Sequence, residues 1–227
     1  IKGNLLDSSL YYSATAYYID WENPILLVQS PAGGFPAMIN AQSAASKGIE
    51  LELNTKLTDN LKLNVGYTYT NAELTEDFII PDGAFGAADG EALPGVPEST
   101  LVSSLHYRKE FADVVMSAQL GVSYKAEFTT GFLEPSIFYE QGYDEIPAST
   151  LWNASVKFDV DSWTFALFAE NLFNADDATA SDGDGKYIID TAAGEVKAGE
   201  QYSTTQLGDQ LYRVRPRTIG ASISYKF

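Results

Sequence analysis

The residue types best suited to acid–base or nucleophilic chemistry are scarce in this sequence. The chain of 227 residues has no cysteine and a single histidine, His106. In its alternating segment, His106 shares the polar side with Ser104, Arg108 and Glu110. An imidazole there could relay a proton or ligate a metal, but one histidine without a base or a second ligand makes a poor site. We therefore expect no catalytic residue, no metal and no cofactor, and interpret His106 as a polar residue that faces an interior.

An acidic segment in the last third of the chain could bind a hard cation. Asp182–Lys186 (DGDGK) follows two further aspartates and resembles the start of a calcium-binding loop. Calcium favours clustered carboxylates at a turn that glycine permits. The distant bidentate glutamate of an EF-hand is missing, although Glu195 and Glu200 lie downstream. We favour an acidic, solvated loop over 176–200, with calcium binding as the alternative.

The elements that position these residues are predicted to be β-strands, because apolar and polar residues alternate along the whole chain. In 61–69 and again in 114–125, every second residue is apolar and most of the residues between are polar or glycine. We expect eight full strands, with Ile1–Gly3 as the tail of a ninth, at 9–21, 45–57, 61–74, 99–110, 114–128, 149–159, 163–173 and 210–227. Most exceed the roughly 5–6 residues usual in soluble proteins and match the roughly 9–11 of a tilted membrane strand.

Short and long connections alternate between the expected strands. Short turns are predicted at Leu5–Ser8, Thr58–Asn60, Phe111–Asp113 and Val160–Ser162, and long loops at 22–44, 75–98, 129–148 and 174–209. An antiparallel barrel with turns on one rim and loops on the other has this pattern. The four long loops hold 19 acidic and two basic residues, which accounts for the whole formal charge of -17. This charge argues against nucleic acid as a partner, and its confinement to one rim indicates a solvated rim.

Two alternatives remain open from composition and pattern alone. A soluble carbohydrate-binding β-sandwich also has strands with one apolar face, and a stand-alone eight-stranded barrel for adhesion or binding would have the same loops. Strand length and the one-sided loops favour membrane strands. Aromatic residues near strand ends fit membrane-interface girdles, namely Tyr17, Tyr18 and Trp21 near one loop and Trp163, Tyr225 and Phe227 near the turns.

Four segments carry a more specific signal. They are Ala16–Asn23 (AYYIDWEN), Ser46–Glu52 (SKGIELE), Phe168–Asn174 (FAENLFN) and Arg215–Phe227 (RPRTIGASISYKF). In this order and spacing they resemble motifs of the TonB-dependent receptors, transporters of the outer membrane of Gram-negative bacteria. The likeness runs over essentially the whole chain.

The resemblance implies an all-β fold, an antiparallel transmembrane β-barrel of 22 strands whose lumen holds an N-terminal plug domain. Residues 1–227 would supply the last eight strands, with no counterpart of the plug in this chain. The implied function is active uptake of a scarce nutrient, of the siderophore-iron, cobalamin or oligosaccharide class, with energy from TonB. The implied partners are outer-membrane lipid, the plug and remaining strands, the TonB complex through the N-terminal part, the barrel-assembly machinery and a small-molecule substrate.

Candidate site residues fall into three groups. Aromatic residues of the long loops are expected to contact substrate: Phe35, Phe85, Phe132, Phe138, Tyr139, Tyr143 and Tyr187. The alternative for each is packing within its loop. Polar residues of the strands are expected to face the lumen and the plug: Glu50, Glu52, His106, Arg108, Lys125 and Glu170. Tyr225 and Phe227 resemble the barrel-assembly signal, although that signal places glycine where this chain has Ser222, with Gly220 two residues earlier.

Overall fold

The computed structural model describes residues 1–7, 9–29, 36–79, 85–132, 145–181 and 211–227, and these residues contain strands and no helix. Within this part of the chain, no helical segment could therefore cross a membrane.

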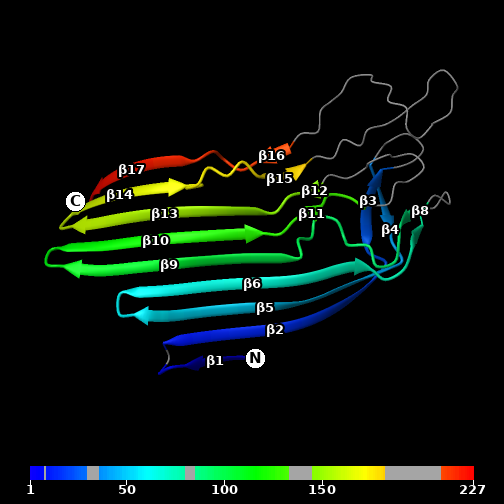
Figure 1. Cartoon of the computed structure of the whole chain (residues 1–227), viewed down its shortest axis with the longest axis horizontal. Helices are drawn as coiled ribbons and strands as arrows, with labels where there is room; N and C mark the ends of the chain where they lie inside the picture. Colours follow the sequence, from blue (N-terminus) through cyan, green and yellow to red (C-terminus); the bar gives the residue numbers. More distant parts are fainter. Residues whose placement is uncertain (8, 30–35, 80–84, 133–144, 182–210) are drawn as a thin grey trace, which may run out of the picture.

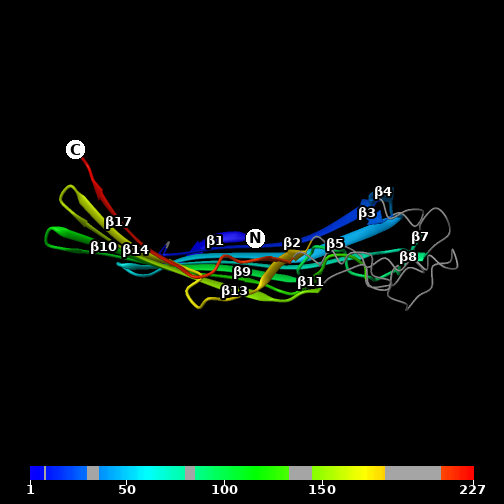
Figure 2. The ribbon, with the colours of Figure 1, turned by 90° about the horizontal axis from the view of Figure 1, so that it is seen from above.

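One large sheet dominates the structure. Its nine antiparallel strands follow the order β1-β2-β5-β6-β9-β10-β13-β14-β17, so each strand lies beside the next one along the chain (Figure 1). Their bounds are β1 (Lys2–Leu5), β2 (Leu10–Glu22), β5 (Ser43–Thr58), β6 (Leu61–Leu74), β9 (Ser99–Phe111), β10 (Val114–Lys125), β13 (Ser149–Val160), β14 (Trp163–Glu170) and β17 (Thr218–Tyr225). Seen edge-on, the sheet is a single twisted layer (Figure 2). Its edges, β1 and β17, do not pair with each other among the described residues.

The two ends of the sheet differ. At one end the strands are joined by short turns, where Leu6, Asp7, Ala112 and Asp161 adopt left-handed backbone angles that tight reversals favour. At the other end, the connections contain four two-stranded hairpins (Figure 1). They pair β3 (Ile25–Gln29) with β4 (Pro36–Asn40), β7 (Phe78–Ile79) with β8 (Phe85–Ala87), β11 (Phe128–Thr129) with β12 (Glu145–Ile146), and β15 (Ala178–Ser181) with β16 (Leu211–Arg213). The short–long alternation is thus confirmed.

The eight predicted strands are all present, and the expected tail is a short ninth strand. Three strands end or break short of the predicted bounds. The strand expected at 114–128 ends at Lys125, and Phe128 belongs to the separate short strand β11. The strand expected at 163–173 ends at Glu170, because Asn171 turns the chain with a φ of 48°. The strand expected at 210–227 is divided into β16 and β17 around Pro216, which has no N–H to donate to a ladder. The loop hairpins were not predicted.

The register gives the sheet two distinct faces. Side chains alternate across each strand, so residues that are direct partners lie on the same face. The row through His106, for example, pairs it with Lys62 on β6 and Gln119 on β10. We call this face the polar face. The opposite face, the apolar face, carries residues such as Leu51, Leu167 and Ile223.

The apolar face has no second layer of described residues upon it. Leu51 is 45% exposed, Leu167 56% and Ile223 66%. Large contiguous apolar surface is rare on monomeric soluble proteins and marks contact with a partner or with lipid. A β-sandwich would bury such a face against another sheet. The single layer of described residues therefore gives the sandwich alternative no support.

The buried core is small and sits at the loop end. Ala41, Ala44, Leu74, Phe78 and Ala87 form a buried cluster. Ala44 and Leu74 are direct partners on the polar face, so this cluster covers that face where the loops begin. Partly buried residues from three of the loop segments pack against it, namely Leu26, Ile39, Leu93 and Phe132. Elsewhere the stability of the sheet rests on its ladders rather than on a core.

Candidate functional site

The polar face carries all six residues predicted to face a lumen. Partners across the ladders place Glu50 opposite Thr15 and Thr68, and Lys125 opposite Thr100 and Ser149. Glu52, His106, Arg108 and Glu170 lie on the same face in other rows. Four sheet glycines, Gly48, Gly66, Gly121 and Gly220, lie on this face as well. The six residues thus share one face, while their position in a lumen and their contact with a plug remain predictions.

Some of the charges on this face are neutralised by near neighbours. Lys157 and Asp159 lie 2.9 Å apart, and Arg108 and Glu110 lie 3.6 Å apart. Asn54 donates a hydrogen bond of 2.7 Å to a carboxylate oxygen of Glu52. These pairs are exposed, so each contributes little to stability in water.

Other charges on the polar face are left without such a neighbour. Among the described residues, Glu50, Lys62 and Glu170 have no ion pair and no side-chain hydrogen bond. The face therefore contains unmatched charges of both signs, as expected for a surface that meets further protein.

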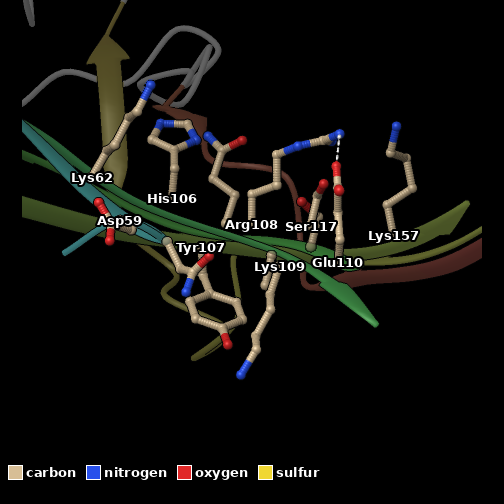
Figure 3. Close-up of a pocket in the computed structure, with 13 residues that line it drawn as sticks. Asp59, Lys62, His106, Tyr107, Arg108, Lys109, Glu110, Ser117 and Lys157 are labelled. Carbon is tan, nitrogen blue, oxygen red and sulfur yellow. Dashed lines mark ion pairs between the residues drawn. The ribbon is translucent and has the colours of Figure 1, made fainter. Parts of the chain in front are cut away.

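Near the turn end, the polar face holds an open hollow of about 880 Å³. Its polar lining comes from β6, β9, β10, β13 and the turn that follows β5, and includes Lys62, His106, Arg108, Ser117, Gln119, Ser155 and Lys157. In Figure 3, Lys62, His106, Arg108, Ser117 and Lys157 project to one side of the ribbon, whereas Tyr107 and Lys109 project to the other. We call this feature the polar hollow.

The rim of the polar hollow is shaped by a turn. Lys56 donates a hydrogen bond of 2.9 Å to Asp59 in the turn between β5 and β6. That hydrogen bond, together with the charge of Lys56, lowers the pKa of Asp59 below its usual value. Asp59 is therefore ionised, and its carboxylate is paired with Lys56. His106 Nε2 and Ser104 Oγ are joined by a hydrogen bond of 2.9 Å.

The aromatic residues predicted to bind substrate are only partly visible in this structure. Phe132 is half-buried and packs against Phe78, with ring centroids 6.3 Å apart. This packing supports a role within the loop core for Phe132. Phe85 begins β8, but its side chain is not described. The others, Phe35, Phe138, Tyr139, Tyr143 and Tyr187, lie outside the described residues. A substrate contact for these residues stays a prediction.

A cluster of aromatic side chains marks the turn end of the apolar face. The rings of Trp163 and Tyr225, direct partners on β14 and β17, have centroids 4.8 Å apart. Phe165 stacks on Trp163 at 6.2 Å, and Phe227 meets Tyr225 edge-on at 5.1 Å. This is the arrangement of an interfacial girdle.

At the loop end, the predicted girdle is only partly correct. Tyr18 is on the apolar face and 67% exposed. Tyr17 and Trp21 are on the polar face instead, since they pair with Gly48 and Ala44. Assigning them to an outward girdle was therefore wrong, because neighbouring residues of one strand point to opposite faces.

The acidic segment 176–200 gives no cation site in the described part. Asp176 pairs with Arg213 at 3.2 Å, and no group of three acidic or histidine ligands gathers among the described residues. Asp182–Lys186, Glu195 and Glu200 lie outside those residues.

Sequence reasoning identified the segment Phe168–Asn174 as a motif but not what its asparagines do. Asn171 is 6% exposed and its side-chain amide donates to the carbonyl oxygens of Ala175 and Arg215. Asn171 Oδ1 accepts a hydrogen bond from the N–H of Ala175. Asn174 Oδ1 accepts one from the N–H of Arg217. The motif thus fastens the end of β14 to the start of β17. Both asparagines have left-handed φ angles, with which the chain turns here.

The two-faced sheet, with turns at one end and loops at the other, defines a segment of the wall of a β-barrel. Residues 1–172 match the family described as "TonB dependent receptor-like, beta-barrel", and the chain belongs to this family. The resemblance seen in the sequence is thus confirmed. The comparison with curated proteins found no match.

Solved structures with this fold are receptors and transporters. The ferric yersiniabactin uptake receptor FyuA from Yersinia pestis aligns with a TM-score of 0.66 and 14% identity over 97% of this chain and 28% of its own. The ferric-catecholate import receptor Fiu from E. coli K12 aligns with a TM-score of 0.60 and 18% identity over 98% of this chain and 26% of its own. The copper transporter OprC aligns with a TM-score of 0.62 and 17% identity over 100% of this chain and 30% of its own. The chain thus spans less than a third of these proteins, and the likeness concerns the fold.

Proposed function

We propose that the chain is part of the barrel of an outer-membrane receptor that takes up a scarce nutrient in a Gram-negative bacterium. One observation carries this proposal. The sheet has an exposed apolar face, an opposite polar face and all of its long connections at one end. In a closed barrel, these surfaces become the lipid-facing wall, the lumen wall and the outer rim.

The open edges of the sheet indicate what completes the barrel. A membrane barrel must pair every strand, because unpaired backbone groups in lipid are costly. β1 and β17 would therefore pair with further strands, and residues 1–227 would form the C-terminal portion of a larger barrel. The unmatched charges on the polar face suit a plug domain inside it. The family membership supports TonB as the source of energy for uptake.

The rival functions have less support. A stand-alone eight-stranded barrel requires the first and last strands to meet, and β1 and β17 are not partners among the described residues. An enzyme that uses a serine nucleophile needs the serine, its base and a third group that orients the base. His106 is hydrogen-bonded to Ser104, but Ser104 does not line the polar hollow, and among the described residues His106 has no carboxylate partner.

Among nutrients, a metal-bearing chelate fits best. The long loops hold an acidic excess that favours cationic or metal-bearing ligands over free anions. Three solved receptors with this fold are named for ferric siderophores or copper. We therefore place iron–siderophore or other metal-chelate uptake first, ahead of cobalamin and oligosaccharides.

An uptake assay tests this function. The complete receptor that includes this chain would be produced in cells lacking their own iron–siderophore receptors, with and without a functional TonB. We expect accumulation of radioactive iron from at least one ferric siderophore, lost in the cells without TonB. Labelled cobalamin and maltooligosaccharides serve as competing substrate classes. Accumulation of none of these in TonB-containing cells, with the receptor present and folded in the outer membrane, would contradict the proposal.

A further inference from the structure

The register brings basic side chains together on four strands of the polar face, β5, β6, β9 and β13. Lys56 on β5 is the direct partner of Lys62 on β6, and Lys62 is the direct partner of His106 on β9. One step along β9 lies Arg108, opposite Ser117, which in turn faces Lys157 on β13. Four cationic side chains and one imidazole thus occupy neighbouring positions on a single surface.

This arrangement opposes the usual preference of sheets. Like charges that face each other directly across a ladder destabilise the pair, and opposite charges are favoured there. Lys56 is balanced by Asp59 at the rim. Lys62, between Lys56 and His106, has no ion pair or hydrogen bond among the described residues. Lys62 is exposed, so its ammonium is free to meet an anion that enters the polar hollow.

The nearby anions lie beside other cations. Glu110 lies 3.6 Å from Arg108, which is longer than a hydrogen bond, and both side chains are largely exposed. Asp159 is occupied by Lys157 and by the hydroxyl of Thr164. Besides the Nη2 group that faces Glu110, the guanidinium of Arg108 has further N–H donors.

The polar hollow has the shape and donors to receive an oxyanion. Its volume of about 880 Å³ is open on one side. Lys62, His106 and Arg108 project into this side from β6 and β9 (Figure 3). Gln119 and Ser155, partners across β10 and β13, add neutral polar groups to the lining. A guanidinium and an ammonium that line one hollow suit carboxylate and phosphate, since charge-assisted hydrogen bonds are shorter and stronger than neutral ones.

We propose that the polar hollow is a binding site for the oxyanion of a carboxylate or phosphate group, with Lys62 and Arg108 as its ligands and His106 beside Lys62 in the same row. The group comes either from a free small anion in the lumen or from an acidic side chain of the plug. The position of the site inside a lumen rests on the proposed function. The binding chemistry does not, because it follows from the register of β6, β9 and β10.

The test uses the complete receptor in uncharged detergent and three variants. Lys62→Gln and the double variant Lys62→Gln/Arg108→Gln remove the proposed ligands. Lys109→Gln is the matched control. Lys109 borders the hollow beside Arg108 on β9, but its side chain projects to the other face (Figure 3) and lies over the ring of Phe111. Heat-modifiable migration on gels shows that each variant is folded. Binding of radiolabelled inorganic phosphate and citrate is measured by equilibrium dialysis.

Two results would support the site and identify its source. If the anion is free, wild type binds phosphate or citrate, the double variant binds about tenfold or more weakly, and Lys109→Gln stays within about twofold of wild type. If the plug supplies the carboxylate, wild type binds neither probe. The double variant then exposes the plug to protease at a lower urea concentration than wild type or Lys109→Gln.

One result would overturn the inference. It is that the double variant and Lys109→Gln behave alike in both measurements. If uptake by the wild-type receptor is intact in that case, the oxyanion site fails while the proposed function stands. If uptake fails but anion binding depends on Lys62 and Arg108, the oxyanion site stands while the proposed function fails.

Discussion

The side-chain amide of Asn171 donates a 2.9 Å hydrogen bond to the carbonyl oxygen of Arg215, 44 residues further along the chain. A second hydrogen bond from the same amide reaches the carbonyl of Ala175, and the N–H of Asn171 donates to Asn153 Oδ1. One buried asparagine thus joins β13, the end of β14 and the approach to β17. The intervening connection contains residues outside the described part, and its two ends are held together here.

Replacing Asn171 by alanine should destabilise this junction. The change leaves the carbonyls of Ala175 and Arg215 without their donor, and it puts alanine at a left-handed φ of 48°. An unsatisfied buried group costs about 1–3 kcal/mol, and because both hydrogen bonds are only part-buried, we expect a cost toward the lower end of this range. We expect a lower urea midpoint for unfolding of the complete receptor in detergent. Asn4→Ala, at an exposed position on β1, should leave that midpoint unchanged, and equal effects would contradict the assigned role.

Gly48 should not tolerate a side chain. The ring of Tyr17 lies over it, and a Cβ there would come within 2.6 Å of Tyr17 Oη and also clash with the carbonyl of Tyr69. The hydroxyl of Tyr17 is held by Thr70 Oγ1 at 2.8 Å, so the ring cannot move without loss. Overpacking of this kind costs about 1–3 kcal/mol.

Gly66 provides the matched comparison for Gly48. It lies on the same face of β6, and the nearest atom to an added Cβ is the carbonyl of Val102 at 3.9 Å. We expect Gly48→Ala to lower the urea midpoint and Gly66→Ala to leave it unchanged or slightly raised. A destabilised Gly66→Ala with an unaffected Gly48→Ala would contradict the register of β2, β5 and β6.

Charge should be tolerated on one face of the sheet and not on the other. Leu167→Arg places a guanidinium on the apolar face, where it would meet lipid at a cost of about 2–4 kcal/mol near the bilayer midplane. Ser222→Arg adds the same group on the polar face of the neighbouring strand, one ladder position away. We expect a strong loss of folded receptor from outer membranes for Leu167→Arg alone, measured by heat-modifiable migration.

The last residue should matter for assembly more than for the folded sheet. Phe227 is fully exposed and touches only Tyr225 among the aromatic residues described. If Tyr225 and Phe227 form the assembly signal, Phe227→Ala should reduce the receptor found in outer membranes while leaving the urea midpoint of the purified protein nearly unchanged. Lys226→Ala is the control. Equal amounts of both variants in the membrane would contradict the assignment.

Strands and their faces were predictable because alternation is local. The alternation in Val114–Lys125 predicts both the strand and which side chains share a face. This prediction does not depend on the neighbouring strands. The end of β14 and the break before β17 were missed because other interactions overrode the pattern. Asn171 leaves the strand for hydrogen bonds to distant carbonyls, and Pro216 interrupts the ladder.

The candidate site was predictable only in part, for a similar reason. His106 and Arg108 were assigned to the polar side correctly from their own strand. The pairing of His106 with Lys62 depends on the register between β6 and β9. Alternation within each strand does not specify that register. The packing of Phe132 on Phe78 joins two loops and was likewise outside the reach of local pattern.

The central claim is that this sheet separates lipid from an aqueous lumen. The chain contains no cysteine, so single cysteines can be placed along β10 and spin-labelled within the complete receptor in bilayers. Relaxation by oxygen, which partitions into lipid, and by a water-soluble nickel chelate would be measured at each position. We expect residues 116, 118, 120 and 122 to favour oxygen and residues 117, 119, 121 and 123 to favour the chelate. Equal accessibility at successive positions, or water on both faces, would contradict the account.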